Sequence, residues 1–355
     1  MRYSCVVVTR NRPDALRLSL PALLAQTRAP LEIFVVDSSD DKDATRAILD
    51  ALRPGTDVPL THVESPAGMT VQRNIGLGLI SGEVVLFPDD DSLLYPDAMA
   101  QIMRVYERDA EGLIGGVCAA EAHEPHESAG LRAAGSGEGA PKSYARKRSD
   151  ALALRILPWR RRLEARFLPD PFLTLADQKY ARLAKPGWLA EERAILVPYM
   201  TGFRMSYRTE VIRGLRFDEG LGRYALFEDI DASLRVLDSH VLAAASDAWI
   251  YHHKAPERRD AGQAMGAMHI LNRAYVLAKD RLPEAAAWAR VCAEARRYAR
   301  YKTWLYRLRA KPGFARDRLR GAERATAGQE EIFAAPPERL AATYAAVKAR
   351  CLQPG

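Results

Sequence analysis

Residues 4–87 alternate between short apolar runs and amphipathic stretches, and this alternation restricts the fold more than any other feature of the chain. Runs such as SCVVVT and LEIFVVD are typical of strands buried on both faces of a parallel sheet. The stretches between them have the apolar spacing of helices. The pattern predicts an α/β fold, with a mostly parallel sheet flanked by helices and joined by right-handed crossovers. The predicted strands are residues 4–9, 31–37, 59–63 and 83–87, and the predicted helices are residues 12–24, 44–52 and 70–80.

Polar residues follow three of the predicted strands, at the point where each strand is expected to end. Thr9, Arg10 and Asn11 close the first strand, Asp37 closes the second, and residues 89–91 follow the fourth. In open sheets of this kind, ligands bind outside the carboxyl ends of the strands. We therefore expect a ligand site at this edge of the sheet.

The segment FPDDDSLL places three carboxylates side by side, Asp89, Asp90 and Asp91. Like charges this close repel one another, and a divalent cation that also binds phosphate oxygens removes the repulsion. Aspartate is also common in solvated turns and at helix N-termini. The triplet alone therefore leaves a metal site and an ordinary turn both open.

Two further polar groups lie downstream. Glu228, Asp229 and Asp231 stand at the start of a predicted helix, whose N-terminus favours the ionised form of a carboxylate. Such a pair can supply a general base, but it can also only compensate the helix dipole. His252 and His253 follow a short apolar run. A histidine pair is more often structural, yet a neutral imidazole becomes a candidate ligand once a metal site is expected.

The alternating pattern changes after residue 120. Residues 121–195 contain a glycine-rich stretch and then arginines mixed with apolar residues, and we interpret them as a helical and loop insertion in a catalytic domain that spans residues 1–260. Residues 261–355 are predicted to form a helical, basic C-terminal region. With 48% hydrophobic residues, the chain can bury a sizeable core, which excludes disorder throughout.

Charge is distributed unevenly along the chain. The first 120 residues contain 11 basic and 17 acidic side chains, whereas the last 75 contain 16 basic and 7 acidic ones. A basic tail of this kind indicates a polyanionic partner, either lipid headgroups or nucleic acid. Two basic amphipathic segments could lie in the plane of the headgroups; the alternatives are packing on the catalytic domain or a homodimer interface. Their apolar residues are Trp159 and Phe167 in the insertion, and Trp288, Val291, Ala295, Tyr298 and Leu305 in the tail.

Cysteine usage and hydropathy bear on the location of the protein. Cys5, Cys118, Cys292 and Cys351 occur singly, which suits a reducing compartment. The chain enters a strand-like run at once and contains no apolar run of 18 residues, so we expect neither a signal segment nor a membrane span. The expected location is the cytoplasm, peripheral on the inner face of the cell membrane.

Taken in order, these elements resemble the family 2 glycosyltransferases, which have the Rossmann-like GT-A fold. The match runs through CVVVTRNRPDALRLSLPALLAQT, LEIFVVDSS, GMTVQRNIGLGLISGEVVLFPDDD and FDEGLGRYALFEDIDASLR, and covers residues 3–118 and about 199–254. Val8 and Arg10 stand where proline and tyrosine are common in the family, which leaves the preferred base open. The QxxRW motif of processive synthases is missing, which favours a single transfer.

The resemblance implies an inverting transfer of one sugar from a UDP- or dTDP-sugar to an acceptor hydroxyl, with Mg²⁺ or Mn²⁺ on the diphosphate. The acceptor would be lipid-linked or a saccharide, in cell-surface polysaccharide or glycolipid synthesis. Asp229 would be the general base, with Glu228 beside it. The other implied roles are donor binding by Thr9, Arg10, Asn11, Asp37, Arg73, Asp89 and Asp90, metal binding by Asp89, Asp91 and His252, and acceptor contacts by Gly202, Phe203 and Glu228.

Two other classes of protein are alternatives to this resemblance. A metal-dependent nucleotidyltransferase also uses carboxylates at strand ends, but it needs a glycine-rich loop after the first strand, which residues 8–13 lack. A basic nucleic-acid-binding protein would use the tail. The acidic front half argues against that class, and we expect no nucleic acid partner.

Overall fold

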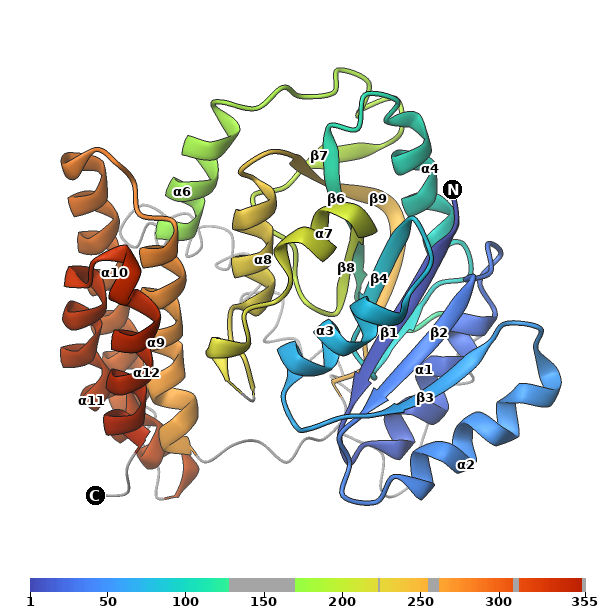
Figure 1. The fold of residues 1–355 in the computed structure, drawn as a ribbon, viewed down its shortest axis with the longest axis horizontal. Coiled ribbons are helices and arrows are strands. Elements are labelled where there is room, and N and C mark those ends of the chain that lie inside the picture. Colours follow the sequence, from blue (N-terminus) through green and yellow to red (C-terminus); the bar gives the residue numbers. More distant parts are fainter. Residues whose placement is uncertain (128–169, 223, 255–261, 309–312, 353–355) are drawn as a thin grey trace, which may run out of the picture.

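The computed structural model describes residues 1–127, 170–222, 224–254, 262–308 and 313–352. Figure 1 shows a central sheet with helices packed around it and a group of C-terminal helices standing together at one end of the molecule. Most of the predicted insertion, including Trp159 and Phe167, lies outside the described residues.

The N-terminal half contains every element that the apolar pattern predicts, with bounds that differ by one residue at most. β1 pairs with β2 and with β4, and β2 pairs with β3, all in parallel. The elements are β1 (Tyr3–Thr9), α1 (Pro13–Leu24), β2 (Glu32–Asp37), α2 (Asp43–Leu52), the 3-10 turn η1 (Arg53–Gly55), β3 (Leu60–Glu64), α3 (Met69–Leu79) and β4 (Val84–Pro88).

The middle of the chain completes the sheet, and the described residues after it are helical. The middle elements are β5 (Ser92–Leu94), α4 (Ala98–Arg108), β6 (Ile114–Ala122), α6 (Pro171–Tyr180), β7 (Ala194–Leu196), β8 (Arg204–Arg208), α7 (Thr209–Leu215), η3 (Glu219–Leu221), α8 (Glu228–Val236) and β9 (Val241–His252). The final elements are α9 (Gly262–Lys279), α10 (Ala285–Leu308), α11 (Phe314–Ala334), η4 (Pro337–Arg339) and α12 (Leu340–Leu352).

The sheet is mixed rather than parallel throughout. Over the described ranges its strands follow the order β3-β2-β1-β4-β8-β6-β9-β5, and β7 pairs with β9. β8 lies between β4 and β6 and is antiparallel to both. β9 runs parallel to β6 but antiparallel to β5 and β7. The parallel half therefore ends at β4, and the antiparallel pairings place the loop after β4 beside the end of β9.

Apolar residues pack on both faces of the sheet. Successive side chains of a strand point to opposite faces, so Cys5 and Val7 of β1 pack with α1, α2 and α4, whereas Val6 and Val8 pack on the other face. Gly76 of α3 lies so close to Val6 that a side chain would overlap it. The sequence GLGLISG is therefore explained by the packing of this helix on β1.

The core around Val6 extends without a break into the C-terminal helices, where it includes Val291, Ala295 and Val347. Gly266 of α9 and Gly321 of α11 let the two helix backbones meet directly. Trp288, Val291 and Ala295 are buried, so this part of the stripe expected to contact a membrane packs inside the protein instead. No helix among the described residues is both long enough and apolar enough to cross a bilayer.

Candidate active site

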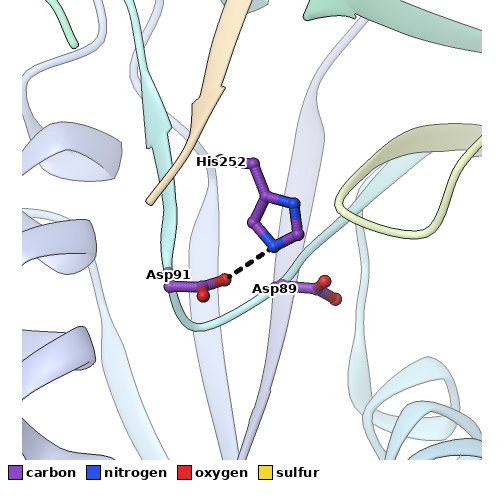
Figure 2. Close-up of side chains that lie close together, drawn as sticks. All are labelled: Asp89, Asp91 and His252. Carbon is purple, nitrogen blue, oxygen red and sulfur yellow. Dashed lines mark ion pairs between the residues drawn. The ribbon is translucent and has the colours of Figure 1, made fainter. Parts of the chain in front are cut away.

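Asp89 and Asp91, on the turn between β4 and β5, meet His252 at the end of β9 (Figure 2). Antiparallel pairing places Ser92 opposite His252 and so fixes this meeting. One ligand atom from each of the three residues lies within 4.8 Å of the others. Two carboxylates and an imidazole are a ligand set that suits a divalent cation such as Mg²⁺ or Mn²⁺. The structure therefore brings together the three residues expected to bind metal.

The charges in this cluster are strongly coupled. Burial works to raise the pKa of Asp91, but the hydrogen bond with His252 and the charge of Arg12 outweigh it and hold the pKa at about 2. His252 Nε2 lies 3.3 Å from Asp91 Oδ1. Burial works to lower the pKa of His252, yet its hydrogen bond with Asp91 and the nearby charges of Asp91 and Asp89 raise it. Asp91 is therefore ionised and ready to act as a ligand.

Phe203 stacks on the imidazole of His252, with ring centroids 4.5 Å apart and an interplanar angle of 14°. Ser92 Oγ donates to the carbonyl of Phe203 at 2.9 Å and accepts from the backbone N–H of Asp89 at 3.0 Å. Phe203, expected on the acceptor side, thus packs against a metal-type ligand and fixes its orientation.

Asp90 turns away from this cluster and into the protein. Thr9 Oγ1 donates to its carboxylate at 2.7 Å, and Arg12 Nη1 lies 2.6 Å from it. Burial raises the pKa of Asp90 to about 7. Asp90 and Thr9, both expected to bind the donor, are thus hydrogen-bonded to each other. Arg12 also contacts Asp91 at 2.6 Å, and its place at a helix start gave no sign of this contact in the sequence.

Asp37 is fully buried at the end of β2. It accepts from the backbone N–H of Ser39 at 2.7 Å and lies 3.2 Å from His62 Nε2. Asn11 has a left-handed backbone, with φ of 55°, and its N–H donates to Ser39 Oγ at 2.7 Å. Arg10 is exposed, 3.8 Å from Asp40. The ends of β1 and β2 therefore form one polar loop cluster, to which His62 was not expected to contribute.

Arg73 lies between the aspartate turn and the acidic pair of α8. Only 1% of its surface is exposed, and Nη1 lies 2.6 Å from Glu228 Oε1 while Nη2 lies 3.3 Å from Asp89 Oδ1. The guanidinium of Arg73 thus contacts both the metal-type cluster, which consists of Asp89, Asp91 and His252, and the acidic pair of α8, Glu228 and Asp229. Arg73 was expected to bind the donor, and Glu228 the acceptor; the structure pairs them with each other.

Of the two acids that begin α8, Glu228 is buried and Asp229 is partly exposed. Asp229 accepts from the backbone N–H groups of Gly202 at 3.0 Å and Ile230 at 2.8 Å. Burial raises its pKa despite these bonds, so desolvation exceeds the expected effect of the helix N-terminus. Burial and the charge of Asp229 raise the pKa of Glu228 to about 8. Gly202 leaves room for both carboxylates: a Cβ there would lie 3.2 Å from Glu228 Oε1.

Asp231 differs from these two acids. It is fully buried, 2.9 Å from Arg235 Nη2 and 2.6 Å from Lys279 Nζ. Lys279 belongs to α9, so this ion pair ties α8 to the C-terminal helices. The helical spacing of the three acids, which turns Asp229 away from the face of Asp231, agrees with this arrangement.

Solved structures with the same fold are glycosyltransferases. The chain matches S. aureus TarS with a TM-score of 0.53 at 16% identity, covering 98% of this chain and 55% of that one. It matches TarS 1-349 in complex with UDP-GlcNAc with a TM-score of 0.52 at 15% identity, covering 98% of this chain and 91% of that one. The match to the mannosyltransferase PcManGT of Pyrobaculum calidifontis, in complex with GDP-Man and Mn²⁺, has a TM-score of 0.51 at 16% identity. It covers 98% of this chain and 86% of that one. The fold is thus that of the GT-A glycosyltransferases.

The sequence also resembles one family. The model of glycosyl transferase family 2 matches residues 4–161, less than half of the chain, and supports a family 2 glycosyltransferase. Bacillus subtilis YwdF, described as an uncharacterized glycosyltransferase, is 29% identical over 107 residues, covering 30% of this chain and 39% of YwdF. The glucosyl-dolichyl phosphate glucuronosyltransferase of Haloferax volcanii is 29% identical over 119 residues, covering 33% and 38%. The matched stretch therefore spans about two-fifths of each curated relative.

Proposed function

We propose that this glycosyltransferase is inverting and metal-dependent, and transfers one sugar from a UDP- or dTDP-sugar to an acceptor hydroxyl. The observation that carries the proposal is Arg73, whose guanidinium contacts Asp89 on one side and Glu228 on the other. These contacts support a single site that contains the metal-type cluster and the acidic pair to which the candidate base Asp229 belongs, as an in-line displacement requires. The complexes of TarS with UDP-GlcNAc and of PcManGT with GDP-Man support a nucleoside diphosphate sugar as donor.

The residues of the site divide the reaction between them. Asp229 would take the proton of the acceptor hydroxyl as the oxygen attacks the anomeric carbon, and its raised pKa suits a proton acceptor. Arg73, which contacts Glu228, would hold that side chain away from the acceptor. Asp89, Asp91 and His252 would hold Mg²⁺ or Mn²⁺. When bound, the cation would neutralise the departing diphosphate.

The test is a thermal-shift series with UDP, dTDP and GDP, each with and without Mn²⁺, because a ligand of the folded state raises its stability by mass action. We expect a uridine or thymidine diphosphate to raise the melting temperature only with the cation. The matched control is Asp91→Asn, which should lose the metal-dependent part of the rise in melting temperature. Equal shifts with and without Mn²⁺ would contradict the proposal.

The proposed acceptor is lipid-linked or a saccharide, used in cell-surface polysaccharide or glycolipid synthesis, and the proposed location is the inner face of the cell membrane. Cys5, Cys118, Cys292 and Cys351 are all free and buried, which suits a reducing compartment. The proposed membrane contact moves to the α10–α11 corner. Three large apolar residues are exposed there: Trp304 at 53%, Leu308 at 64% and Phe314 at 42%.

A further inference from the structure

Three polar side chains from α9, α10 and α11 meet in a cluster that the transfer reaction does not use. They are His269, Tyr306 and Arg318. The rings of His269 and Tyr306 lie 6.3 Å apart, and the guanidinium carbon of Arg318 lies 4.7 Å from the centroid of the Tyr306 ring. His269 Nδ1, Tyr306 Oη and Arg318 Nε are each buried and lack a hydrogen bond of ordinary geometry to the described residues, although the Arg318 guanidinium lies close enough to Tyr306 to interact with it. Buried polar atoms normally have a partner, so three together form a cluster that can take up a polar ligand or water.

The charge around this cluster is positive. The charged groups that act on His269 from the packed helices are Lys302, Arg318 and Arg273, and all three are cations. Arg273 forms an ion pair with Asp170. Arg318 forms none within the described residues, although it is half-buried. A half-buried cation without a counter-charge among the described residues favours an anionic ligand, so we expect the group that this cluster binds to be an anion.

His269 itself contributes a neutral donor. Burial, followed by the charges of Lys302, Arg318 and Arg273, lowers its pKa to about 3. The neutral imidazole has one N–H, which Nδ1 can carry. Together with the phenol of Tyr306 and the guanidinium of Arg318, it forms a set of donors that matches the several acceptor oxygens of a phosphate.

The cluster adjoins the loop that carries the candidate base. The ring of Phe227 meets the ring of His269 edge-on, with centroids 5.6 Å apart, and Phe227 directly precedes Glu228 and Asp229. Its backbone is left-handed, with φ of 72°, which turns the chain into α8 at this point. A group bound at His269 would therefore lie behind the loop that presents Asp229, on the side of the C-terminal helices.

We propose that His269, Tyr306 and Arg318 bind a phosphate group carried by the acceptor. This rests on the proposed transfer at Asp229, because only then does a group bound beside Phe227 belong to an acceptor. Binding of the phosphate would hold the acceptor against the helices while its hydroxyl reaches the base. The phosphate can be that of a soluble phosphate ester or that of a lipid headgroup.

The test follows the imidazole resonances of His269 by NMR during titration with inorganic phosphate, with UDP and Mg²⁺ saturating the donor site. We expect a saturable shift in the wild type and at least a tenfold weaker apparent affinity in Arg318→Gln. The matched control is Arg320→Gln, on the same helix but exposed and paired with Asp317 at 3.5 Å. It should bind phosphate as the wild type does. Equal affinity in the wild type and Arg318→Gln, or no shift of His269 at all, would overturn the proposal.

Two further experiments are needed. The first identifies the source of the phosphate, and the second tests the proposed function separately from the anion site. Glycerol 3-phosphate tests a soluble ester and phosphatidylglycerol vesicles test a headgroup; a His269 shift with either supports the site and assigns its source, and with neither opposes it. Hydrolysis of the donor by water, without an acceptor, is measured in parallel. Arg318→Gln should retain it, since Arg318 does not contact the donor site. If the wild type does not hydrolyse the donor, the proposed function is contradicted. The phosphate titration still tests the anion site independently of that result.

Discussion

At the scale of single residues, Asp229 decides the proposed mechanism. Asp229→Asn keeps the shape of the side chain and removes its basicity, so kcat should fall by roughly 10²–10⁴-fold. The KM for the donor should barely change, because the base acts on the acceptor proton. Steady-state release of the nucleoside diphosphate measures both constants. Near-wild-type kcat, or a defect in donor binding alone, would move the search for the base to Glu228.

The same residue predicts a dependence on pH. Burial raises the pKa of Asp229 above the ordinary 3.8, and a base is active only when unprotonated. Lowering the pH through the raised pKa should therefore remove activity, and kcat/KM should fall at a higher pH than an ordinary aspartate would give. The midpoint belongs to the Glu228–Asp229 pair, since the two groups interact. Residual activity of Asp229→Asn should lack this acid limb; an unchanged limb would refute the assignment.

Asp91 provides the matching prediction for the cation. Asp91→Ala should abolish turnover, and excess chelator should do the same to the wild type. The fold should survive, because Arg12 keeps its contact with Asp90 at 2.6 Å when Asp91 is removed. Circular dichroism and the melting temperature check the fold, and product release with added Mn²⁺ checks the activity. Full turnover in chelator would exclude the metal site.

The aspartate triplet shows how far sequence reasoning reaches at this scale. Three carboxylates after a buried strand predict a polar site, and two of them, Asp89 and Asp91, do face His252. The inward turn of Asp90 was not predictable, because it depends on the backbone of the β4–β5 turn and on Arg12 approaching from α1. Arg73 is a similar case: its partner Glu228 is far away in the sequence, and no local pattern indicates their contact.

At the scale of the elements, two glycines of α3 give a paired prediction. Gly76→Ala would press a methyl group into Val6 of β1, and overpacking of this kind costs about 1–3 kcal/mol. A methyl group on Gly78 would meet nothing within 4 Å, so Gly78→Ala should stabilise by about 0.5–1 kcal/mol through helix propensity. Chemical denaturation measures both variants. Similar effects of the two substitutions would show that α3 does not pack on β1 as described.

The sheet itself was only partly predictable. Runs such as SCVVVT identify buried strands because both faces are covered. The five-residue β8 carries no signal for its direction or its neighbours, and its insertion between β4 and β6 depends on contacts far apart in the chain. That insertion matters for function, since the antiparallel half brings β9, and with it His252, to the turn after β4.

At the scale of the whole molecule, the C-terminal helices continue the core of the sheet. Val6 of β1 and Val347 of α12 belong to one buried cluster, and Lys279 of α9 pairs with Asp231 of α8. The basic tail is therefore part of the body that holds the site, and its apolar stripe is largely used in packing. Any membrane contact must come from residues that this packing leaves exposed, as at the α10–α11 corner.

The last prediction tests that corner. Trp304→Ser combined with Phe314→Ser should abolish flotation with anionic liposomes at moderate salt, because it removes two apolar side chains from a region rich in basic residues. The control is Leu79→Ser, which changes a residue of similar exposure, 48%, on α3. It should float as the wild type does. Gel filtration accompanies the assay, since a wild-type dimer that the double variant breaks would assign the corner to a second copy of the chain. Wild-type protein that stays at the bottom of the gradient would exclude the membrane contact.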